Sequence, residues 1–146
     1  MHGHGDVEFA GVEPNLTLET LTAAVDLAKA QKIGVILGVG GGSVADGAKY
    51  VACAALYDGD GWDIVSGRFH PRQALPVGIV LTLPATGSES NVGAVVTRKS
   101  TLEKRVFYVP PARPRFAIRA HGNAALGTHA GVDAATTERI IRAACS

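Results

Sequence analysis

The stretch Ile33–Tyr57, which reads IGVILGVGGGSVADGAKYVACAALY, decides the fold of this chain. An apolar run typical of a buried strand stops at three glycines, Gly40–Gly42, and Ser43 opens an alanine-rich segment that predicts a helix. Glycine lets a ligand approach the backbone closely, and the first N–H groups of a helix have no acceptor within it. The helix dipole also favours negative charge at that end. The order strand, glycine turn, helix therefore predicts a phosphate or diphosphate site at residues 40–43.

A tight turn without a ligand is the alternative interpretation of the same glycines. We place Asp46 in the first turn of the predicted helix, where a carboxylate would stabilise the helix by less than about 1 kcal/mol. On this alternative, Lys49 is a solvent-facing side chain of the same helix.

Length and composition exclude several classes of protein. The 146 residues suffice for one domain with its own core, and 47% apolar and 18% charged residues are ordinary for a globular chain. A net charge of +1 without a basic stripe argues against a nucleic-acid partner. The sequence has no apolar run long enough to cross a membrane and does not start like a signal peptide. Cys53 and Cys145 form no CxxC pair, so we expect a reduced, cytoplasmic setting.

The rest of the chain alternates predicted strands with predicted helices. Leu18, Leu21, Val25 and Ala28 form a helical stripe that Asn15 or Thr17 can cap. One predicted helix carries this stripe, two more span 43–57 and 134–144, and the predicted strands are 7–10, 33–39, 77–83 and 116–118. The segments 92–98 and 104–109 predict a β-hairpin. Residues 58–76 predict a loop anchored by Trp62, and 110–115 predict an extended segment. This pattern predicts an α/β fold with a parallel sheet, whose ligands sit beyond the carboxyl ends of the strands.

A second loop of interest, Thr82–Asn91, follows another buried strand. Its hydroxyl groups, glycine and amide suit the oxygen atoms of sugars and phosphates, although a polar turn that bonds its own backbone has the same composition. Because both loops leave strands at their carboxyl ends, we expect them to meet at one edge of the sheet and to share one ligand.

A serine hydrolase is a third interpretation. Gly41–Ala45 approximates the turn that presents a nucleophilic serine, here Ser43, although alanine replaces the final glycine. The acid and the histidine that such an enzyme needs would come from Asp58, Asp60 or Asp63 and from His70, His121 or His129.

Several segments together resemble a known family. GVEPN, GVGGGSVADGAKYVA, DGDGWDI, LTLPATGSESNVGAVVTRKSTLEKRVF and RPRFAI follow one another in the order and spacing of the iron-containing alcohol dehydrogenases, between about residue 4 and residue 118. The resemblance is to the branch of butanol dehydrogenases and broad aldehyde reductases. It implies hydride transfer between an alcohol and an aldehyde with NAD or NADP, and a divalent metal, iron or zinc, that polarises the substrate oxygen.

The resemblance also implies roles for particular residues. Gly41, Gly42 and Ser43 would contact the diphosphate of the cofactor, and Asp46 would lie beside it. Lys104 would reach the ribose. The remaining residues implied to line the cofactor cleft are Thr82, Thr86 and Asn91.

The chain also departs from the family pattern. The family carries a further βα unit before GVEPN that we do not find here, and Leu16 stands where a second proline is usual. After RPRFAI the family continues into a helical metal domain, whereas residues 119–146 diverge. GVDA resembles the segment that holds the aspartate ligand, which makes Asp133 the one metal-ligand candidate, but Thr137 stands where a histidine ligand would follow. We therefore assign no metal site.

These observations lead to one expectation about function and one alternative. Residues 1–118 are expected to be an incomplete nucleotide-binding domain of an oxidoreductase, with weak cofactor binding or none and little or no turnover by this chain alone. The alternative is a non-catalytic nucleotide-binding or assembly module, whose exposed apolar surface would favour a homo-oligomer.

Overall fold

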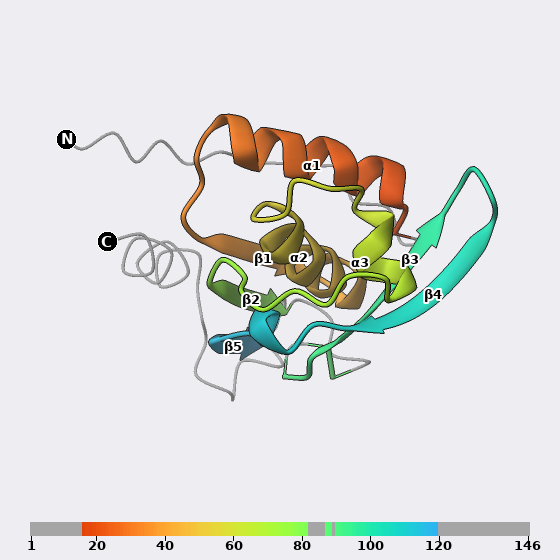
Figure 1. Cartoon of the computed structure of the whole chain (residues 1–146). Coiled ribbons are helices and arrows are strands. Elements are labelled where there is room, and N and C mark those ends of the chain that lie inside the picture. The colour runs from red at the N-terminus through yellow and green to blue at the C-terminus, as the bar shows by residue number, and fades with distance from the viewer. Residues whose placement is uncertain (1–15, 82–86, 89, 120–146) are drawn as a thin grey trace.

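The structure of the chain is a computed structural model that describes residues 16–81, 87–88 and 90–119 (Figure 1). Three parallel strands form a sheet in the order β1-β2-β5, and two antiparallel strands form a separate hairpin, β3-β4. The strands are β1 (Ile36–Gly40), β2 (Val77–Leu81), β3 (Gly93–Arg98), β4 (Glu103–Tyr108) and β5 (Phe116–Arg119), and the helices are α1 (Leu18–Ala30), α2 (Gly42–Ala54) and α3 (Trp62–Ser66). The predicted α/β fold with a parallel sheet and a hairpin is confirmed.

Helix α2 is the centre of this arrangement. It packs on β1 and β2 of the sheet, on α1 and on β3 of the hairpin, so that it lies between the sheet and the hairpin (Figure 1). Every residue from Ala45 to Ala54 is buried, and this run includes Lys49. A helix that is covered all round has no solvent face. The prediction of a solvent-facing Lys49 is therefore wrong.

Helix α1 is closed by a cap at each end. The hydroxyl of Thr17 accepts a hydrogen bond from the amide of Thr20 at 3.3 Å, so Thr17 is the N-cap of the two predicted candidates. At the other end Lys32 has a φ of 51°, its amide donates to the Lys29 carbonyl, and the Ile33 amide donates to the Ala28 carbonyl. This pair of hydrogen bonds is the Schellman motif, which turns the chain from α1 toward β1.

The first turn of α1 holds the hairpin. The amide of Thr97 in β3 donates to the Leu16 carbonyl at 2.9 Å, and the carboxylate of Glu19 accepts from the amides of Lys99 and Ser100 at 3.1 and 3.2 Å. Partial burial acts to raise the pKa of Glu19, but these amide hydrogen bonds outweigh it and hold the pKa below its ordinary value. These contacts fix the hairpin to the start of α1.

The boundaries of two predicted elements shift. β1 begins at Ile36 rather than at residue 33, because the chain first completes the turn after α1, and α2 ends at Ala54 rather than at Tyr57. Since α2 begins at Gly42, Asp46 lies in its second turn and not in its first, so the prediction of a first-turn carboxylate is wrong.

Two segments predicted without helix contain short helices. In the predicted loop 58–76, the Asp60 carboxylate accepts from the Trp62 amide at 2.9 Å and starts α3, which buries Trp62 and ends at Gly67 with a φ of 83°. In the segment predicted to be extended, Pro110–Ala112 is a 3₁₀ turn closed by the Ala112 amide on the Val109 carbonyl. The predicted strand 7–10, the predicted helix 134–144 and the end of the predicted strand at 82–83 lie outside the described residues.

Within the described ranges, no helix is both long enough and apolar enough to span a membrane.

Candidate functional site

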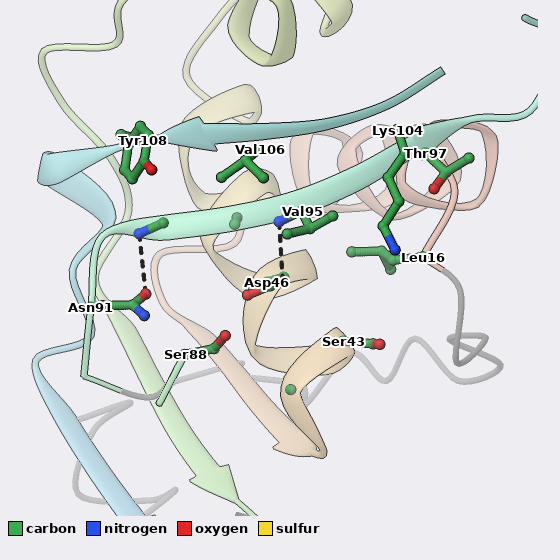
Figure 2. A pocket seen from close by; sticks show the side chains of 13 residues that line it. Leu16, Ser43, Asp46, Ser88, Asn91, Val95, Thr97, Lys104, Val106 and Tyr108 are labelled. Carbon is green, nitrogen blue, oxygen red and sulfur yellow. Dashed lines mark hydrogen bonds between the residues drawn. The ribbon is translucent and has the colours of Figure 1, made fainter. Parts of the chain in front are cut away.

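A cavity of about 520 Å³ lies between the start of α2 and the hairpin (Figure 2). It opens next to the carboxyl end of β1, where ligands of parallel α/β sheets bind. Its lining comprises Leu16, Gly42, Ser43 and Asp46, then Ser88, Asn91, Gly93, Ala94, Val95 and Thr97, and finally Lys104, Val106 and Tyr108 of β4. The structure therefore brings Gly42, Ser43, Asp46, Asn91 and Lys104 of the predicted site residues together around one space.

Two positions of the turn before α2, Gly40 and Gly41, suit glycine for different physical reasons. A Cβ added at Gly40, where φ is 156°, would stand 2.6 Å from Cγ2 of Val44. A Cβ added at Gly41, the N-cap of α2, would meet no atom within 4 Å. Gly40 thus allows the turn to pack on α2, while Gly41 leaves open space at the positive end of the helix dipole, where an anion is stabilised.

Asp46 ties α2 to the hairpin. Its Oδ2 accepts from the Val95 amide at 3.1 Å, and its Oδ1 is buried with no hydrogen-bond partner in the part of the chain that the structure describes (Figure 2). Burial raises the pKa of Asp46, against the opposing effects of the Ser88 hydroxyl, the Val95 amide and the Lys49 ammonium group. Asp46 therefore belongs to the wall of the cavity as a buried carboxylate and not as an exposed helix-stabilising acid.

Asn91 lies at the entrance to β3. Its side-chain oxygen Oδ1 accepts from the Gly93 amide at 3.1 Å and from Nζ of Lys49 at 2.8 Å, and Nζ of Lys49 also donates to the Gly93 carbonyl at 2.6 Å. The contact of Lys49 could not be predicted from the sequence, because Lys49 lies 42 positions before Asn91 and nothing local indicates that they meet.

Three alternate residues of β4 form one wall of the cavity. Lys104, Val106 and Tyr108 share a face because side chains of a strand point alternately to its two sides. Val106 and Tyr108 are 58% and 68% exposed, which leaves an apolar group and an aromatic ring accessible beside the lysine. Of these three residues, Lys104 alone was implied by the family resemblance, although the period-2 spacing of Val106 and Tyr108 indicates that they share its face.

Several predicted residues are not tested by this geometry. Thr82, Thr86 and Asp133 lie outside the described residues. Among the residues that are described, no group of three or more histidine, cysteine, aspartate or glutamate side chains could hold a metal ion. The side chains of those described residues therefore do not fit the iron or zinc that the resemblance implies.

The hydrolase interpretation gains no support from the described part of the cavity. Asp46 is the one carboxylate in the lining that contains Ser43, and no histidine is part of that lining. The predicted acid Asp63 instead accepts from the Tyr57 hydroxyl at 3.0 Å and faces Arg68 at 3.8 Å. His121 and His129 lie outside the described residues.

The fold and the cavity define the class: an α/β protein that offers a helix N-terminus and polar loops at the carboxyl edge of a parallel sheet. Residues 2–120 match the family of iron-containing alcohol dehydrogenases, and the chain belongs to that family. The resemblance found in the sequence motifs is confirmed.

Relatives of known identity agree with this assignment. The chain is 49% identical over 121 residues to the NADPH-dependent aldehyde reductase YqhD of Escherichia coli (strain K12), a match that covers 81% of this chain and 31% of the relative. The crystal structure of an NADH-dependent butanol dehydrogenase A from Thermotoga maritima matches with a TM-score of 0.76 and 46% identity, over 77% of this chain and 28% of that chain.

A sulfoacetaldehyde reductase from Bifidobacterium kashiwanohense, solved in complex with NAD⁺, matches with a TM-score of 0.72 and 25% identity, over 76% of this chain and 30% of that chain. The present chain thus spans about a third of the length of the relatives that it matches.

Proposed function

We propose that the described part of this chain is the dinucleotide-binding part of an NAD(P)-dependent alcohol dehydrogenase or aldehyde reductase. The observation that carries the proposal is the cavity in which the N-terminus of α2, the loop before β3 and the cationic face of β4 converge. Family membership and the NADPH- and NADH-dependent names of the relatives support the same cofactor class.

The residues of the cavity suit the parts of a dinucleotide. The helix end at Gly41–Ser43 offers backbone N–H groups and open space to the diphosphate. Lys104 supplies a cation on the facing strand, and Asn91 supplies an amide that can donate to a ribose or phosphate oxygen. A bound nicotinamide would donate hydride to an aldehyde when reduced, or accept hydride from an alcohol when oxidised. The chain binds and orients the cofactor in this proposal.

The test is a titration of the 146-residue chain with NADPH and with NADH, each with and without added iron or zinc. We expect weak, saturable binding of at least one dinucleotide without metal-dependent turnover. The Lys104→Met variant should bind about 5- to 10-fold more weakly, since it loses one charge-assisted contact worth about 1 kcal/mol. Lys99→Met at the exposed hairpin tip is the matched control and should bind as the unaltered chain does.

Absence of binding of both dinucleotides at millimolar concentration would refute this function for the chain. Equal losses of affinity in Lys104→Met and Lys99→Met would instead show that the cation on β4 does not face the ligand. NADPH-linked aldehyde reduction by the purified chain would refute the expectation of little turnover.

An assembly module is the second candidate, and one observation favours it. β1 pairs only with β2 among the described strands, and an apolar groove of about 150 Å³ runs beside it between α1 and α2. Val39 on this edge is 49% exposed. Exposed apolar surface next to an unpaired strand edge favours association with another chain. Light scattering at increasing concentration measures this association, and a strict monomer would remove the support.

We propose a cytoplasmic setting for this chain, because Cys53 is a free thiol and free thiols are usual in a reducing compartment. Burial raises the pKa of Cys53 to about 12, which keeps this side chain in the unreactive thiol form.

A further inference from the structure

Lys49 is a buried ammonium group that the proposed binding site does not yet use. It is fully buried on α2, with Nζ 2.6 Å from the Gly93 carbonyl, 2.8 Å from Oδ1 of Asn91 and 3.9 Å from Oδ1 of Asp46. A buried charge is stable only with such acceptors and an opposite charge around it. These contacts join the middle of α2 to the loop that enters β3. Lys49 is not itself part of the cavity lining, but it contacts three residues that are.

The first consequence concerns the orientation of Asn91. Its Oδ1 accepts from both Lys49 and the Gly93 amide, so rotation of the carboxamide by half a turn would lose two hydrogen bonds. Figure 2 shows the oxygen of Asn91 on the side of β3 and its nitrogen on the opposite side. Because Asn91 lines the cavity, its NH₂ group is the end that remains for a ligand, and that end donates hydrogen bonds.

The second consequence concerns charge. Asp46 places a buried carboxylate in the cavity wall, where an uncompensated negative charge would repel a phosphate. Nζ of Lys49, from the same helix, lies 3.9 Å from the Asp46 carboxylate, and Lys104 of β4 lines the same cavity. β3 contributes no ionisable side chain to the lining, and the loop before it contributes the Ser88 hydroxyl. The positive charge of Lys49 therefore compensates the negative charge of the Asp46 carboxylate.

We propose that Lys49 is a positioning residue for an anionic ligand of this cavity: it fixes the Asn91 amide as a donor and neutralises the buried Asp46 carboxylate. The identity of that ligand as a dinucleotide diphosphate rests on the function proposed above. The arrangement of Asn91 and Asp46 does not, so the two can be tested separately.

The first experiment needs no ligand. In the full chain, NMR follows the side-chain amide of Asn91 and the titration of the Asp46 carboxyl carbon in Lys49→Met and Lys49→Arg. Lys49→Met should shift the Asn91 amide resonances and raise the titration midpoint of Asp46, since a unit positive charge leaves its vicinity. Lys49→Arg should restore most of both effects. Lys29→Met is the matched control, because Nζ of Lys29 also donates to a backbone carbonyl, that of Tyr57, but away from the cavity.

The second experiment measures binding of inorganic pyrophosphate and of NADPH between pH 3.5 and pH 8.5, a range that begins below the ordinary aspartate pKa of 3.8. The ratio of variant to unaltered affinity at each pH cancels the titration of the ligand itself. For Lys49→Met this ratio should be about one tenth or less at pH 8.5, and it should recover as the pH falls through the Asp46 titration. A loss of packing alone would lower the affinity equally at every pH.

The outcomes separate the two proposals. If the unaltered chain binds neither pyrophosphate nor NADPH, the proposed function fails, and the NMR experiment still decides the role of Lys49. Unchanged Asn91 and Asp46 signals in Lys49→Met, or a binding loss that does not vary with pH, would overturn that role. If Lys49→Met does not fold, the Lys49→Met/Asp46→Asn double variant, which removes both charges, replaces it. A shifted Asn91 amide in the double variant supports the proposal, and an unshifted one overturns it.

Discussion

Replacing Gly40 by alanine tests the turn on which the whole site depends. The added Cβ would stand 2.6 Å from Cγ2 and 3.1 Å from Cβ of Val44, whereas carbon atoms in contact lie about 3.5–4.0 Å apart. Overpacking of this kind costs about 1–3 kcal/mol, and the φ of 156° adds backbone strain on the order of 1 kcal/mol for a residue with a side chain. We therefore expect Gly40→Ala to lower the free energy of unfolding by about 2–4 kcal/mol.

Urea unfolding is the assay, and the fluorescence of the buried Trp62, the single tryptophan of the chain, is its signal. The double variant Gly40→Ala/Val44→Ala removes the atom nearest to the new methyl group. It should recover about 1 kcal/mol or more of the loss relative to the sum of the two single variants.

Gly41→Ala is the control on the adjacent residue. An added Cβ meets no atom within 4 Å there and φ is −88°, so the free energy of unfolding should change by less than about 1 kcal/mol. The methyl group would occupy the open space at the start of α2 and should weaken dinucleotide binding about 10-fold or more, since the diphosphate approaches the backbone there. Equal losses of stability in Gly40→Ala and Gly41→Ala would refute this account of the turn.

Three further predictions concern the scaffold. Lys32→Gly should stabilise the chain by about 0.5–1 kcal/mol in the urea assay, because glycine relieves the φ of 51° in the Schellman motif, and a destabilised variant would contradict the motif. Leu21→Ala, at a side chain that is 2% exposed, should cost about 2–5 kcal/mol, whereas Leu102→Ala, at one that is 84% exposed, should change stability by less than about 0.5 kcal/mol. Glu19→Gln should be less stable than the unaltered chain at neutral pH. Because the folded-state pKa of Glu19 lies below its ordinary value of 4.5, this difference in stability should shrink as the pH falls below 4.5. A difference in stability that does not depend on pH would argue against the carboxylate–amide contacts.

The sequence predicted those parts of the fold that depend on local pattern. Apolar runs located β1, β2 and β5, the glycines marked the start of α2, and the turn at residues 99–101 marked the hairpin. Helix α3 was missed because DGDGW has the composition of a loop. The helix starts on a side-chain hydrogen bond of Asp60 and is stabilised by burying Trp62, Ile64 and Val65, which is a tertiary effect.

The candidate site was predictable only in part for a related reason. The glycine turn and the loop that ends at Asn91 follow strands at their carboxyl ends, so topology places them together, whereas Lys104 of the hairpin was implied only by the family resemblance. The burial of Lys49 depends on α2 being covered by the sheet, by α1 and by the hairpin at once, which no pattern within the helix reveals. The role of Asp46 as an acceptor for the Val95 amide likewise needs the hairpin in place, 49 positions further along the chain.

The complete enclosure of α2 has a consequence for how ligand preference can change among relatives. Substitutions between Ala45 and Ala54 disturb tightly packed atoms on every side, so this segment can accept few of them without loss of folding. The cavity-facing side of β4 carries Lys104, Val106 and Tyr108, which are all exposed and can vary at little cost. We expect sequence diversity among relatives to accumulate on that strand, while the helix opposite stays nearly invariant.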